Sequence, residues 1–171
     1  MKNNKINKGL ALMLFMALFS LKSMAGVGDE FFHLSGGYLY NNTLNASIGY
    51  EKELSYDDAW EIFAEAGDRW EKDPECGKVC TKSFWKHYYW DGGFLYKKSL
   101  TSWRNSSLRL DFGPVFGAYK GTFFYGLEGS FEWNYVFRSG WKLVVKQKNN
   151  VGFRKGDSFR NGVTLGVKIP L

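Results

Sequence analysis

Hydrophobic and polar residues alternate with a period of two along most of the chain after residue 30. This period is typical of β-strands that have one apolar and one polar face. The C-terminal segment shows it most clearly, because every odd-numbered residue from Val163 to Leu171 is apolar. Thr164, Gly166 and Lys168 fall on the opposite face. We therefore expect a strand that runs to the last residue.

Seven further segments show the same alternation, although it is irregular in the segment 84–96, where aromatic residues fall on both faces. The expected strands cover about residues 31–40, 44–52, 59–70, 84–96, 107–119, 123–136, 141–149 and 161–171. Their polar rows carry too much charge to form a core against a second sheet, but they suit the lumen of a transmembrane barrel. Eight antiparallel strands close such a barrel without an exposed edge. The pattern predicts an all-β fold, an eight-stranded antiparallel outer-membrane β-barrel.

Charges of both signs occur on the rows that would face the lumen. An eight-stranded barrel is just wide enough for its own side chains, so we expect a salt-bridged network that plugs it. The predicted lumen network is Glu61, Glu65, Arg109, Asp111, Glu128, Glu132, Lys142, Lys146 and Lys168. The sequence contains no phosphate-binding glycine loop, zinc-ligand spacing or paired-carboxylate site, so we expect no cofactor, no metal ion and no catalytic residue.

The connections between strands support this topology. With the N-terminus in the periplasm, the periplasmic turns are expected near residues 55–58, 97–103 and 138–140, and the outer loops near 41–43, 71–83, 120–122 and 149–158. Pro114 interrupts one strand and predicts a bulge or a missing ladder hydrogen bond, because proline has no N–H to donate. The alternative is a soluble lipocalin-like barrel or sandwich, in which the polar rows would face outward.

Residues 1–25 have the features of a secretory signal peptide. Basic Lys2, Lys5 and Lys8 precede an apolar run from Leu10 to Leu21, and small residues before position 26 suit a signal peptidase. Cleavage after Ala25 would leave a single barrel domain, residues 26–171, with no cysteine at its start for a lipid anchor. It also removes four lysines and no acidic residue, so 19 basic residues face 17 acidic ones and the net charge falls from +6 to about +2. No basic stripe remains for nucleic acid.

Two further patterns involve reactive side chains. His33 and Ser35 are two residues apart on one strand and therefore share a face. Because the neighbouring apolar residues occupy the other face, we interpret this pair as lumen-facing polar residues, with a hydrolase site as the weaker alternative. Cys76 and Cys80 are the only cysteines, and in an exported chain they predict a disulfide at the tip of the longest outer loop.

The C-terminal half resembles the TraO family of conjugative-transposon proteins from Bacteroides-type bacteria. The shared features are Phe123, Tyr125 and Gly126, the pair Glu132 and Tyr135, the strand Leu143–Val145 and the ending Gly162–Lys168. With "WDGGFLY" and "LRLDFGPVFGAYK" in the family's order, the resemblance covers about residues 60–171.

The resemblance implies a non-enzymatic outer-membrane component of a conjugal transfer apparatus, with no catalytic residues to carry over. Its expected partners are outer-membrane lipid and other envelope or transfer proteins, without direct contact to nucleic acid. Two alternatives remain open. One is a general small barrel that serves surface binding or envelope integrity, and the other is an outer-membrane enzyme that modifies lipid A.

Overall fold

The computed structural model describes residues 28–40, 42–54, 57–70, 77, 87–153 and 159–171. Eight strands follow one another along the chain. They are β1 (Glu30–Leu39), β2 (Thr43–Glu53), β3 (Ala59–Arg69), β4 (Tyr88–Trp103), β5 (Ser106–Tyr119), β6 (Thr122–Val136), β7 (Lys142–Gly152) and β8 (Phe159–Pro170). None of the described residues belongs to a helix that could cross a membrane.

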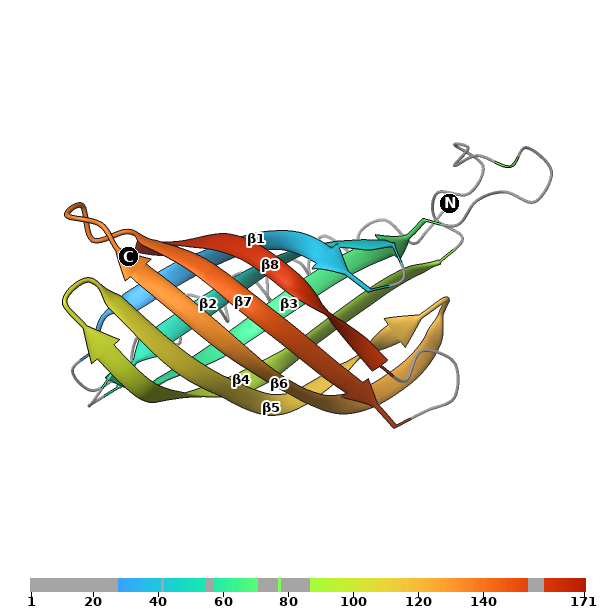
Figure 1. The fold of residues 1–171 in the computed structure, drawn as a ribbon. Helices are drawn as coiled ribbons and strands as arrows, with labels where there is room; N and C mark the ends of the chain where they lie inside the picture. Colours follow the sequence, from blue (N-terminus) through green and yellow to red (C-terminus); the bar gives the residue numbers. More distant parts are fainter. Residues whose placement is uncertain (1–27, 41, 55–56, 71–76, 78–86, 154–158) are drawn as a thin grey trace, which may run out of the picture.

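Every strand pairs antiparallel with the next one, and β8 pairs with β1, so the sheet closes into a barrel (Figure 1). The predicted all-β, closed, eight-stranded antiparallel barrel is therefore confirmed. Residues that pair around the barrel form a circuit. They are Glu30, Lys52, Trp60, Tyr96, Phe112, Gly129, Asn149, Asn161 and Tyr40. The circuit returns to β1 ten residues beyond its start, and this stagger requires the strands to tilt against the barrel axis.

The two ends of the barrel differ in their connections. One end, here named the terminal end, carries residues 28–29, Leu171 and the connections 54–58, 104–105 and 137–141. The other, here named the loop end, carries the connections 40–42, 70–87, 120–121 and 153–158. Four of the seven connections agree with the predicted positions; the predicted loop 71–83 lies almost wholly outside the described residues.

Two predicted boundaries are wrong. The segment 97–103 is the end of β4 rather than a turn, and β7 continues through Asn149 to Gly152. In β4 a bulge shifts the register between Ser99 and Thr101, so the two-residue alternation changes phase there. Lys97 pairs with Ala59, the first residue of β3, so the residues of β4 after Lys97 have no partner strand on that side. They are largely exposed on both faces. A strand of this kind gives no clean alternating pattern.

The ladder between β4 and β5 is interrupted at Pro114, as the sequence predicts. Gly93 pairs with Val115 and Tyr96 with Phe112, in the same register, with no pairing of Gly113 or Pro114 to β4 between them. The backbones approach closely here, because a Cβ at Gly113 would collide with the carbonyl oxygen of Phe94.

The polar rows face into the barrel and the apolar rows face out. Large side chains such as Phe116, Phe131 and Leu165 are about half exposed on the outer wall, whereas Lys97 and Glu132 are fully buried. The lipocalin-like arrangement, with polar rows outward, is therefore wrong for this chain. The buried apolar cluster inside the barrel is small and consists of Phe63, Leu95 and Val115.

Candidate functional site: the charged lumen

The lumen side chains come from every strand, because alternate residues of each strand point to the barrel axis. The structure places all nine residues of the predicted lumen network inside, each at most 7% exposed. They do not form isolated pairs. Each belongs to a chain of ion pairs that extends along the barrel.

The centre of the lumen is the ammonium group of Lys97. Its Nζ lies 2.6 Å from Glu51 Oε2, 2.7 Å from Glu61 Oε2 and 2.6 Å from Glu132 Oε2. Lys168 joins two of the same carboxylates, with Nζ at 2.6 Å from Glu51 Oε2 and 2.5 Å from Glu132 Oε1. Two lysines and three glutamates from five different strands are thus bonded together, which ties the walls of the barrel to one another.

Ion pairs continue from this centre to the terminal end. Arg109 binds Glu51 at 2.9 Å through Nη1 and Glu53 through Nη2. Lys142 Nζ lies 2.7 Å from Glu53 Oε1 and 4.0 Å from the centre of the Phe31 ring. These contacts link β1, β2, β5 and β7 near the terminal end.

Towards the loop end, two lysines of β7 bind carboxylates on β3, β5 and β6. Lys146 Nζ lies 3.1 Å from Asp111 Oδ2 and 3.5 Å from Glu128 Oε1. Lys148 Nζ lies 2.7 Å from Glu65 Oε2 and 3.0 Å from Glu128 Oε2. These pairs link neighbouring levels of the lumen into one network.

An aromatic layer covers the network at the loop end. The guanidinium of Arg160 lies 4.2 Å from the Tyr89 ring centre and 4.6 Å from that of Phe124, and its Nη1 is 2.9 Å from Asp91 Oδ2. The Tyr89 hydroxyl donates a hydrogen bond of 2.7 Å to Glu65. A cation held between two aromatic rings is stabilised by their negative faces, so the rings of Tyr89 and Phe124 stabilise Arg160 in this position.

Little free space remains between these groups. A cavity of about 10 Å³ lies in the lumen beside His33, Ser35, Ser47 and Thr164. That volume holds about one water molecule. The described part of the lumen is therefore filled by side chains and is not an open channel.

Glu51, Glu61 and Glu132 also form a group in which one carboxylate oxygen from each residue lies within 4.8 Å of the other two. Such a group could hold a metal ion, but here the ammonium of Lys97 lies within 2.7 Å of all three. The cation that these carboxylates require is supplied by the chain itself.

The His33 and Ser35 side chains both point into the barrel but do not bond to each other. His33 Nδ1 donates a hydrogen bond of 2.6 Å to Glu61, whereas the Ser35 hydroxyl is bonded to that of Ser47 at 2.6 Å. A nucleophilic site requires a base hydrogen-bonded to the nucleophile. The geometry fits the interpretation of the pair as lumen filling.

Several lumen residues were missing from the predicted network. They are Glu51, Asp91, Lys97, Lys148 and Arg160, together with His33, which was expected in the lumen but not in the ion-pair network. Glu51 and Lys148 lie on polar rows that the alternation already reveals, so that signal could have found them. Lys97 could not be found in this way, because the alternation fails directly after it. Cys76 and Cys80 lie outside the described residues, and their disulfide stays a prediction.

Outside the lumen, Asp58, which directly precedes β3, binds the part of β4 that extends past the first residue of β3. Its Oδ2 accepts hydrogen bonds from Tyr96 at 2.7 Å and Lys98 at 2.9 Å, and its Oδ1 accepts one from the Ser99 N–H at 2.9 Å. Partial burial alone would raise the pKa of Asp58, but the bonds from Lys98, Tyr96 and Ser99 outweigh it and lower the pKa from 3.8 to about 2.

We expect Asp58→Asn to destabilise the barrel by about 1–3 kcal/mol at pH 7, since it weakens hydrogen bonds to a charged acceptor. The pKa is lower in the folded state, so this contribution is complete above about pH 4 and is lost as the pH falls towards 2. Urea unfolding in detergent micelles at pH 7 and pH 2 measures both effects. The neighbouring Asp57→Asn is the control, because Asp57 is exposed. Equal losses in both variants would contradict the role of Asp58.

Comparison with known proteins gives no family model, no curated protein and no solved structure that matches this chain. The resemblance to the TraO family therefore rests on the sequence motifs alone.

Proposed function

We propose that the chain is a non-enzymatic outer-membrane β-barrel that acts through its outer surface and loops, as a component of a conjugal transfer apparatus. The observation that carries the membrane location is the inverted barrel, with paired charges inside and half-exposed large apolar side chains outside. A water-soluble protein rarely exposes a continuous apolar belt of this kind. The strands, at 10 to 16 residues, are long enough for a tilted span of the bilayer, which needs about 9–11.

Aromatic side chains at both ends of the outer wall support the same location. Trp103 and Trp141 are exposed near the terminal end, and Tyr40, Phe153 and Phe159 near the loop end. Outer-membrane barrels carry such aromatic girdles at the two interfaces, with short turns in the periplasm and longer loops outside. We accordingly assign the terminal end to the periplasm and the loop end to the cell surface.

The filled lumen supports action by contact rather than by transport. Among the described residues, paired charges and Arg160 fill the lumen and leave no wide path for solutes. The His33 and Ser35 arrangement offers no activated nucleophile, which weighs against the lipid A-modifying alternative. The link to conjugation comes from the sequence resemblance, and a general surface or envelope barrel is the alternative.

Deletion of the gene in a host that carries a conjugative element separates these two functions. We expect the transfer frequency to fall at least tenfold and to recover when the gene is supplied in trans. A frequency equal to that of the parent strain would contradict the transfer role while leaving the membrane location intact.

A further inference from the structure

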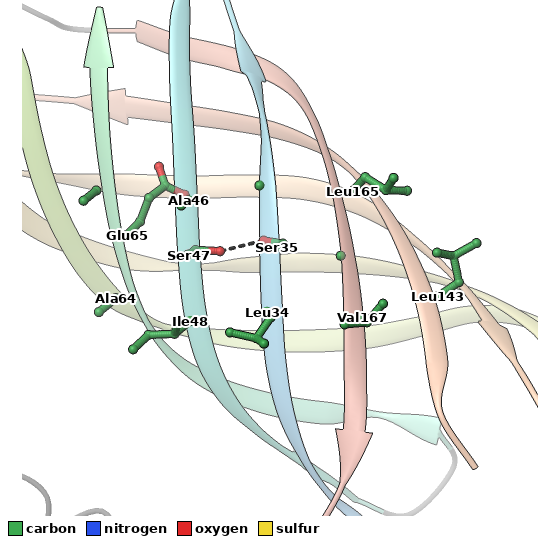
Figure 2. Close-up of a pocket in the computed structure, with 13 residues that line it drawn as sticks. Leu34, Ser35, Ala46, Ser47, Ile48, Ala64, Glu65, Leu143, Leu165 and Val167 are labelled. Atoms are coloured by element: carbon green, nitrogen blue, oxygen red, sulfur yellow. Dashed lines mark hydrogen bonds between the residues drawn. The ribbon is translucent and has the colours of Figure 1, made fainter. Parts of the chain in front are cut away.

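A shallow hollow of about 650 Å³ lies on the outer wall where β8, β1, β2 and β3 run side by side. Figure 2 shows Leu34, Ile48 and Val167 next to one another on three neighbouring strands. Register pairs them as one row, Val167 with Leu34 and Leu34 with Ile48. Figure 2 also labels Leu165, which lies in the adjacent row.

That adjacent row forms the floor of the hollow. Leu165 pairs with Gly36, Gly36 with Ala46, and Ala46 with Ala66. Three of these four side chains are no larger than a methyl group. They project less from the barrel than the larger side chains of Leu34, Ile48 and Val167 in the adjacent row, which makes the hollow. The opposite half of the barrel differs, since bulky Phe94, Phe112, Phe116 and Phe131 are exposed on it.

The hollow offers no polar side-chain group to a ligand. Ser35 and Ser47 border it, but their hydroxyls are bonded to each other at 2.6 Å. Glu65 also borders it, but its carboxylate accepts bonds from Lys148 and Tyr89 inside the barrel. A ligand here must be wholly apolar along the contact.

The lining favours a hydrocarbon chain over a protein partner. Hot spots of protein interfaces are rich in Trp, Tyr and Arg, and the lining contains none of them. The hollow also begins near the terminal end, because Leu143, which lines it, is the second residue of β7. It ends on β3 at Ala66. The row in which Tyr38 pairs with Leu44 lies further towards the loop end and does not line the hollow.

We infer that this hollow binds an acyl chain of a phospholipid from the periplasmic leaflet. The inference rests on the proposed membrane location. A flexible acyl chain can follow a shallow groove of small side chains more closely than the rigid surface of a folded protein can. Its burial there removes apolar area from water and breaks no hydrogen bond. A second apolar hollow on the opposite half of the wall, between Phe94, Phe112 and Leu127, is smaller, at about 340 Å³, and is lined by bulky aromatic rings.

The test is a double variant, Ala46→Leu/Ala64→Leu, which fills the hollow. Both alanines are exposed, so the larger side chains project outward without disturbing the lumen. Gly129→Leu is the matched control, because Gly129 faces outward on β6 and a Cβ there meets no atom within 4 Å. Each protein is folded into vesicles of phosphatidylethanolamine and phosphatidylglycerol with added lipid A, then extracted and examined by native mass spectrometry.

We expect the wild type and the Gly129→Leu variant to retain one phospholipid after detergent exchange, and the double variant to retain at least fivefold less. Equal retention by all three would overturn the inference, as would retention of lipid A or of a second protein copy in its place. Heat-modifiable migration on gels checks insertion separately. A wild type that does not insert would overturn the membrane location itself, and with it this inference.

Discussion

Lys97→Met is expected to lower the free energy of unfolding by about 3–5 kcal/mol, the cost of removing one partner from a buried ion pair. The substitution removes the ammonium that lies within 2.7 Å of Glu51, Glu61 and Glu132 while preserving most of the side-chain volume. Glu51 and Glu132 would then keep Lys168, whereas Glu61 would depend on its hydrogen bond to His33 and on Lys146 at 3.9 Å. Urea unfolding in phospholipid vesicles, monitored by tryptophan fluorescence, measures the loss.

The adjacent lysine provides the matched control. Lys98 points outward with its side chain about half exposed and pairs with Asp58 at 2.9 Å, and exposed pairs contribute only about 0–1 kcal/mol. Lys98→Met should therefore cost far less than Lys97→Met. Adding Glu61→Gln to Lys97→Met should recover part of the loss, because it removes one uncompensated charge. Similar losses for the two lysine variants would show that the central cluster does not stabilise the barrel.

Leu165→Arg is expected to destabilise the barrel in a bilayer by about 2–4 kcal/mol, because a charge on the lipid face near the midplane must leave water. Leu165 is 58% exposed and lies in the middle of β8. In a water-soluble protein an arginine at so exposed a position would change stability by only about 0.5 kcal/mol.

The control for this prediction is an arginine at a different depth in the bilayer on the same strand. Phe159 is also about half exposed but begins β8 at the loop end, where the cost of arginine falls to about 0–1 kcal/mol. Each arginine variant is compared with the alanine variant at its own position, so that lost apolar contact is subtracted. Equal costs at residues 159 and 165 would contradict a bilayer around the middle of the barrel.

The alternation of side chains made the barrel itself predictable from sequence. In β6, Glu128, Ser130, Glu132 and Asn134 fall on one face, and all four are buried in the structure. A row of polar side chains such as this one can be buried only if it faces a polar lumen. The sequence was therefore compatible with few folds other than a barrel. Pairing partners could not be predicted, because each depends on barrel closure. The bond of His33 to Glu61, 28 residues away, is an example.

Lys97 shows the physical limit of the pattern. The bulge after Ser99 shifts the phase of β4, and the strand continues beyond β3 with both faces exposed. Because the segment 97–103 lacks clean alternation, it resembled a turn. Lys97, the lumen cation with the most ion pairs among the described residues, was therefore predicted to lie in a turn. The outer-wall hollow was equally hidden, since it arises from Gly36, Ala46 and Ala66 on three different strands that only register brings together.

We propose that the apolar outer wall is in contact with lipid. Dilution of urea-unfolded residues 26–171, the chain without the predicted signal peptide, into preformed phospholipid vesicles tests this contact. We expect the chain to float with the vesicles, to resist extraction by alkaline carbonate and to show heat-modifiable migration. A chain that instead folds to a monodisperse species in buffer without lipid or detergent would contradict it.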